Sequence, residues 1–106
     1  MYDELIMPEE LDAVITALCA DFSRRSRVIA ERTAPYNVIM EYRFLNYRIM
    51  NAAIEIAGSR DAREFIEDIG FCRGYAASEL FMLSEVIYKQ KKREVRDNIA
   101  RRLSLI

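Results

Sequence analysis

Two pairs of carboxylates in the C-terminal half of the chain have a spacing that could bind a divalent metal. Glu64 and Glu67 form one pair, and Glu94 and Asp97 form the other. Residues three apart on a helix lie on the same face, so each pair could present its oxygens together. Oxygen ligands of this kind suit Mg²⁺. The pattern would fit metal-assisted hydrolysis.

The remaining sequence argues against this chemistry. All-helical nucleotide pyrophosphohydrolases carry a similar acidic spacing, but on two separate helices. Here both pairs fall on one predicted helix, too far apart to share an ion, and Phe71 stands where a metal-binding Asp would be needed. The chain also has no histidine, the commonest general base and metal ligand. We therefore expect no catalytic residues, no cofactor and no metal site, and we do not expect an enzyme.

A basic segment near the C-terminus is the strongest charge feature. The stretch from Lys89 to Arg102 carries about +5 and the rest of the chain about −6, against a net charge of −1. Such an asymmetry indicates electrostatic partnership. Three interpretations stay open: a solvated helical face, contact with nucleic-acid phosphates, or docking to an acidic surface of this chain or a partner. The candidate residues are Lys91, Lys92, Arg93, Arg96, Arg101 and Arg102.

A second candidate surface combines tyrosine and arginine in the middle of the chain. Both residue types are enriched at the energetic centres of protein interfaces. The candidate partner-binding residues are Tyr36, Arg43, Tyr47 and Arg48. The alternative is that the two arginines pair only with nearby carboxylates, such as Glu41 and Glu55.

Three long helices are predicted to position these residues. Apolar side chains recur at helical spacing over 8–32, 36–57 and 61–102. Pro35 separates the first two helices, and Gly58 ends the second. Because helix 36–57 is apolar on two sides, we expect it to be central or to contact a partner chain as well.

The third predicted helix is very long. Unbroken over 61–102, it would span about 60 Å. We expect it either to break near Gln90, which gives a short fourth helix, or to project from the body and pair with another chain. Two glycines four residues apart would open a smooth strip on it, suited to close packing of helix 36–57 or of a second copy. This strip consists of Gly70, Gly74 and Ala77.

Composition bounds the class of protein. A chain of 106 residues with 52% hydrophobic residues indicates one domain with a real core. Its two cysteines, Cys19 and Cys72, are expected to be buried thiols. No apolar stretch is long enough to span a membrane, and the acidic start from Met1 to Glu4 lacks the basic region of a signal peptide. We therefore expect a cytoplasmic protein.

These patterns together predict an all-α fold. We expect an antiparallel three-helix bundle with a very long third helix or a short fourth C-terminal helix. Because helix 36–57 is apolar on two sides and the third helix outruns the body, we also expect a homodimer and no contact with a membrane.

One stretch resembles a known group of proteins. The run Phe-Ile-Glu-Asp-Ile-Gly-Phe-Cys-Arg-Gly-Tyr at 65–75, followed by Ser-Glu-Leu at 78–80, resembles small uncharacterised helical proteins of Firmicutes phages and mobile elements. The resemblance covers 36–88, about half of the chain. It implies a small accessory or regulatory protein without catalysis. Such proteins include inhibitors of host defence nucleases, which often present acidic surfaces.

We therefore expect a non-enzymatic helical protein that binds and regulates or inhibits another protein, for example as a phage-type inhibitor of a host nucleic-acid-binding system. The alternative is a nucleic-acid-binding accessory protein that uses the basic C-terminal helix.

Overall fold

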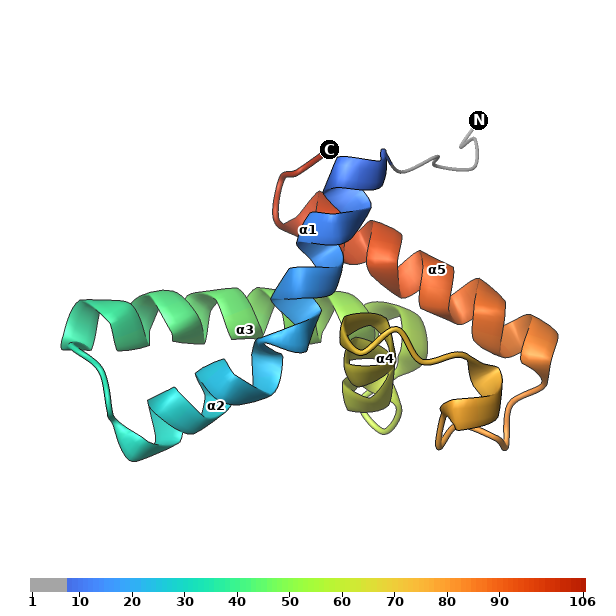
Figure 1. Ribbon diagram of the computed structural model, residues 1–106, viewed down its shortest axis with the longest axis horizontal. Coiled ribbons are helices and arrows are strands. Elements are labelled where there is room, and N and C mark those ends of the chain that lie inside the picture. The colour runs from blue at the N-terminus through green and yellow to red at the C-terminus, as the bar shows by residue number, and fades with distance from the viewer. Residues whose placement is uncertain (1–7) are drawn as a thin grey trace.

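The computed structural model of this protein describes residues 8–106, which form an all-helical structure (Figure 1). The acidic start from Met1 to Glu4 lies outside the described residues. The all-α class is confirmed, since residues 8–106 contain helices and no strand. The helices are α1 (Glu9–Ala20), α2 (Phe22–Glu31), α3 (Tyr36–Ala57), α4 (Ala62–Gly70), the short 3₁₀ helix η1 (Tyr75–Ala77) and α5 (Glu85–Arg102).

The first predicted helix is two helices. The chain turns at Asp21, and Figure 1 shows α2 leaving the axis of α1 at this point. The side chain of Asp21 binds Arg24 and Arg25, and short polar side chains of this kind compete with regular helical geometry. The break redirects α2 so that it lies along α3. Helix α3 itself spans the range expected from the sequence, with Pro35 before it and Gly58 after it at φ 82°.

Both alternatives expected for 61–102, an unbroken helix and a break near Gln90, are wrong. Helix α4 ends at Gly70, and α5 begins only at Glu85, so the break lies well before Gln90. The connection contains Cys72 at φ 55°, a conformation that ends helices. Ser84 then caps α5, because its hydroxyl accepts a hydrogen bond from the Ile87 N–H at 3.2 Å. Two separate helices of moderate length, α4 and α5, therefore form in place of one long helix that projects from the body.

The glycine strip is also wrong as a continuous surface. Gly70 ends α4, Gly74 precedes η1, and Ala77 lies in η1, so the three residues do not share a helix face. Gly70 is a point of close packing, but its neighbour is α1 rather than α3. A Cβ added at Gly70 would lie 2.5 Å from the backbone nitrogen of Ala20.

The core lies where α4 and α5 pack on the C-terminal half of α3 and where α1 packs on α4. The buried residues of α3 lie from its middle onward (Asn46, Ile49, Ala52 and Ala53), whereas its first half is covered on one side only, by α2. Cys19 belongs to this core, and burial raises the pKa of its thiol to about 12. The expectation for Cys72 is wrong, because its position in the connection leaves it exposed. No helix among residues 8–106 is both long and apolar enough to cross a bilayer.

The contact between α4 and α1 predicts opposite responses to alanine at two glycines. Gly70→Ala should destabilise the protein by about 1–3 kcal/mol, because the added methyl group is forced against the α1 backbone. Gly74→Ala should change stability by less than about 1 kcal/mol, since a Cβ there meets nothing within 4 Å. Urea denaturation of both variants checks this. Equal stabilities would show that α4 and α1 are not in close contact at Gly70.

Candidate protein-binding face of helix α3

Four large apolar side chains lie exposed along one line of α3. Tyr36 is 77% exposed, Phe44 63%, Tyr47 67% and Met40 42%. Their spacing of four, four and three residues places them on one face of the helix. We call these four residues the aromatic face. Contiguous apolar area of this kind on a helix is typical of a surface that binds another molecule.

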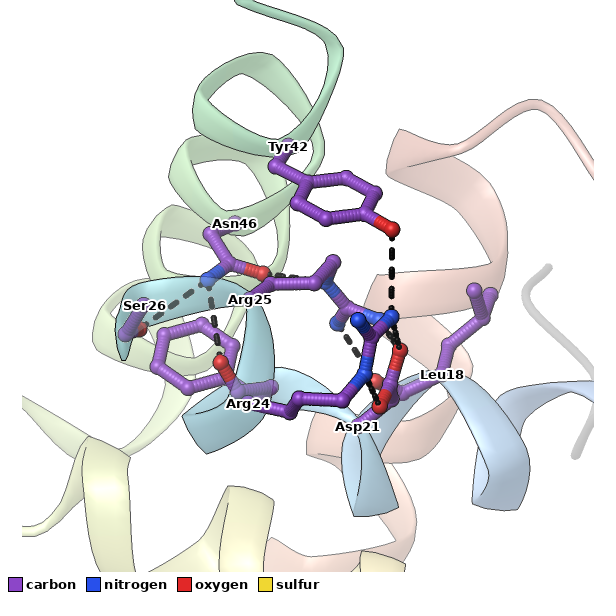
Figure 2. A network of polar contacts seen from close by, with 8 residues as sticks. Leu18, Asp21, Arg24, Arg25, Ser26, Tyr42 and Asn46 are labelled. Carbon is purple, nitrogen blue, oxygen red and sulfur yellow. Dashed lines mark hydrogen bonds and ion pairs between the residues drawn. The ribbon is translucent and has the colours of Figure 1, made fainter. Parts of the chain in front are cut away.

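The opposite side of α3 is fixed by a buried arginine (Figure 2). Arg25 of α2 is only 2% exposed. Its Nε donates to Oδ1 of Asn46 at 2.6 Å, and its Nη2 donates to the carbonyl of Leu18 at 2.5 Å. The amide of Asn46 in turn donates to the carbonyl of Phe22 at 3.1 Å. Asn46 lies on α3 and both accepts a hydrogen bond from α2 and donates one to it. These two hydrogen bonds fix the rotation of α3 about its own axis.

Asp21 completes this network at the junction of α1 and α2. Its two carboxylate oxygens accept from Arg24 at 2.5 and 2.6 Å, which holds the pKa of Asp21 below its ordinary value. Arg24 also donates to the hydroxyl of Tyr42 at 3.1 Å. With Tyr42 and Asn46 both turned toward α2, as Figure 2 shows, the aromatic face of α3 must point away from it.

The aromatic face contains a hollow of about 310 Å³. Its lining residues are Phe44, Tyr47, Arg48, Asn51 and Arg102. The first four follow the spacing i, i+3, i+4, i+7, which is the four-residue hole that receives one side chain of a second helix in knobs-into-holes packing. The guanidinium carbon of Arg48 lies over the ring of Phe44, 5.2 Å from its centroid, so these two lining residues also contact each other.

The partner-binding residues predicted from the sequence lie on or beside this face. Tyr36 and Tyr47 belong to it, exposed Arg43 lies at one edge, and half-buried Arg48 lies at the other. Neither arginine forms an ion pair within residues 8–106; Glu55 instead binds Arg102. Phe44 and Asn51 were not among the predicted partner-binding residues, although their spacing relative to Tyr47 would have indicated the hollow.

The basic C-terminal helix does not project. Val95, Ile99 and Ala100 of α5 are fully buried against the body. Its cations are turned back onto the chain: Lys91 donates to the carbonyl of Ile56 at 3.2 Å, and Lys92 to that of Arg73. Arg96 binds Asp12 and Arg102 binds Glu55, while Arg93 and Arg101 also make contacts. The basic residues therefore help to hold α5 in place.

A second buried polar cluster fastens the connection between α4 and α5. Oδ2 of fully buried Asp68 accepts from the hydroxyls of Ser78 at 2.6 Å and Tyr88 at 2.7 Å. Its Oδ1 has no hydrogen-bond donor among residues 8–106, and it forms an ion pair with Nη1 of Arg73 at 3.5 Å. The ring of Tyr88 stacks on Phe65 with 5.4 Å between centroids. Through its two hydrogen bonds, Asp68 on α4 holds both the segment between α4 and α5 and α5 itself.

The carboxylate pairs lie on different helices, Glu64 and Glu67 on α4, Glu94 and Asp97 on α5. The reason given for discounting them, a shared helix, is therefore wrong. Glu64 accepts the backbone N–H of Glu79 at 3.3 Å instead of meeting the second pair. Across residues 8–106, no cluster of three or more acidic or cysteine side chains is placed to hold a metal ion.

Comparison of the chain with protein-family models, curated proteins and solved structures finds no match. What the chain can bind follows from its own geometry. The aromatic face combines exposed apolar area, flanking arginines and a helix-shaped hollow, and these features suit another protein chain.

Removing the amide that binds the buried arginine should destabilise the fold. Asn46→Ala leaves the Arg25 guanidinium buried with one acceptor fewer, so we expect a loss of about 2–4 kcal/mol. The matched control is Asn37→Ala, an exposed asparagine of the same helix, which should stay within about 0.5 kcal/mol of the wild type. Chemical denaturation of both variants measures the difference. Equal effects would contradict the role of the network in holding α2 on α3.

Stability should also depend on the charge of Glu64. The pKa of Glu64 is raised above its ordinary value, mainly by burial and further by the neighbouring Asp68. Arg73 lies 3.6 Å away but is one-third exposed, so water screens its opposing effect. Because the folded state binds this proton more tightly, the group favours folding at low pH, and this contribution disappears as pH rises through the raised pKa.

Glu64→Gln should therefore be more stable than the wild type at pH 7, with the difference vanishing near pH 4, the ordinary range of a glutamate. Thermal denaturation of the two proteins across this pH range provides the test. A Glu64→Gln protein that is less stable at pH 7 would mean that the Arg73 ion pair outweighs burial.

Proposed function

We propose that this chain is a non-enzymatic helical interaction protein that binds another protein through the aromatic face of α3 and thereby regulates it. One observation carries the proposal: Tyr36, Phe44 and Tyr47 are each more than 60% exposed on one side of α3. The other side of this helix is held against α2 by the hydrogen bond between Arg25 and Asn46. A side chain that served only the core of this chain would not need to stand there.

The gain from covering this face is large enough to support specific binding. Full burial of a large apolar side chain contributes about 1.5–3 kcal/mol. Tyrosine and arginine also dominate the energetic centres of interfaces, and Arg43 and Arg48 flank the aromatic line. The arginines can hydrogen-bond carboxylates of the partner, and their lack of an ion pair within residues 8–106 leaves them available for this.

The geometry favours a helix as the bound element. The face is long and narrow, and its hollow has the outline of a hole in helix–helix packing. An amphipathic helix with one apolar residue to fill the hollow and acidic residues along its edge would match both the shape and the charge. A flat or extended partner would leave the hollow unfilled.

The alternative function, nucleic-acid binding through α5, has less support. Lys91, Lys92, Arg96 and Arg102 contact oxygen atoms of this same chain. Phosphate binding would have to replace these contacts, and the counterion release that drives such binding would be reduced accordingly.

Site-specific photo-crosslinking tests the proposal. A photoreactive phenylalanine analogue at position 44 should give protein adducts in cells that make the chain, and these adducts should survive nuclease treatment. The same analogue at Arg27, an exposed position of α2 on another surface, is the matched control and should give few. Adding Tyr47→Ala should lower the yield at position 44 by about tenfold or more, as expected for an interface centre.

Equal adduct yields at positions 44 and 27 would contradict the proposal. Adducts that contain nucleic acid and disappear with nuclease would favour the alternative function.

A further inference from the structure

The geometry points to a second copy of this protein as the chain that covers the aromatic face, paired antiparallel through α3 about a two-fold axis. This inference rests on the proposed function, since it assigns a second copy to the same surface. A different protein regulated through this face would have to compete with the self-pairing. It goes further than the expectation of a dimer from the sequence, because it assigns the contacting residues and their register.

The first reason is that the face carries both a hole and the side chain that would fill it. The hole is formed on α3 by Phe44, Tyr47, Arg48 and Asn51, and Arg102 of α5 also lines it. Met40, 42% exposed, lies one turn before Phe44 on the same line. In an antiparallel pair, the N-terminal part of each face lies opposite the C-terminal part of the other. Met40 of each copy then enters the hole of the other copy, and the two-fold axis passes beside Phe44.

The second reason is charge complementarity in this same register. Glu41 and Arg48 lie on one edge of the face, two helical turns or about 10 Å apart, and neither forms an ion pair within residues 8–106. A two-fold axis perpendicular to both helices brings like edges together. Glu41 of one copy therefore meets Arg48 of the other, and the symmetry makes this ion pair twice. The same alignment of the two helices therefore places Met40 in the hole and forms both Glu41–Arg48 ion pairs.

On the other edge of the face, repulsion between like charges weakly opposes dimerisation. Arg43 lies there, close to the axis, so the two copies bring their Arg43 side chains near each other. Both are exposed, and water and salt screen their repulsion. Two ion pairs and four covered apolar side chains on each helix outweigh this single contact between like charges.

The size of the face sets the expected affinity. From Tyr36 to Asn51 the helix is about 24 Å long. One such helix pair buries an area at or below about 1,200 Å², the small end of specific interfaces. We therefore expect a reversible dimer with a dissociation constant on the order of 1–100 μM.

Charge exchange at the two edge residues provides a sharp test. Glu41→Arg places a second arginine opposite Arg48 of the other copy, and Arg48→Glu places a second glutamate opposite Glu41. Each variant alone should dimerise at least about tenfold more weakly than the wild type. An equal mixture of the two should form a heterodimer in which one of the two ion pairs is kept and the other is restored with reversed polarity. The double variant E41R/R48E should dimerise like the wild type.

Sedimentation equilibrium from about 1 to 200 μM, a range that brackets the expected dissociation constant, measures the wild type, the two single variants, their mixture and the double variant. Arg27→Glu on α2 is a charge-reversal control that should leave the wild-type affinity unchanged. Recovery in the mixture also excludes misfolding of the single variants, because an unfolded chain could not restore pairing.

A wild-type chain that remains monomeric over this range would overturn the inference. So would a dimer that ignores both single exchanges, because it would use another surface. If the chain is monomeric but position 44 crosslinks to a different protein, the proposed function stands and only self-pairing fails. A monomer without adducts at position 44 contradicts both.

Discussion

The buried guanidinium of Arg25 constrains the rest of the structure. A cation that is 2% exposed must have its donors satisfied. The acceptors come from Asn46 on α3, Leu18 on α1 and Asp21 at the turn between α1 and α2. Burial lowers the pKa of Arg25, which shows the cost of holding the charge there. Because the acceptors accommodate the charge only in one arrangement, the turn at Asp21, the direction of α2 and the rotation of α3 are linked.

This link explains why the chain exposes aromatic side chains. Helix α3 is apolar on two sides, and only one of them can face α2 and the core. Asn46 and Tyr42 are held toward α2 by their hydrogen bonds. The opposite side of α3, with Tyr36, Phe44 and Tyr47, therefore faces solvent. At the other end of the molecule, Asp68 performs a similar task by holding Ser78 and Tyr88, so that α5 packs along α3 and its cations turn back onto the chain. The aromatic face is then the largest exposed feature of α3.

Local signals predicted the helical class and the extent of α3, because Pro35 and Gly58 restrict the backbone directly. They did not predict the gap between α4 and α5. The 3.6-residue periodicity continues through 71–84, while the contacts that stop the helix join Asp68 to residues ten and twenty positions later. Tyr47 and Arg48 could be identified as binding candidates from their types. Which of the two apolar sides of α3 faces outward depends on Arg25, a contact that no sequence pattern indicated.

Hydroxyl-radical footprinting of the tyrosines, Phe44 and Met40 would test the account most directly. The account predicts that Met40, Phe44 and Tyr47 react readily in dilute solution and become protected when the protein is concentrated, while buried Tyr88 stays unreactive throughout. Protection of the α3 residues already in the dilute chain would contradict it, because α3 would then be turned the other way. Unchanged reactivity at high concentration and in nuclease-treated extract of cells that make the chain would show that no protein covers this face.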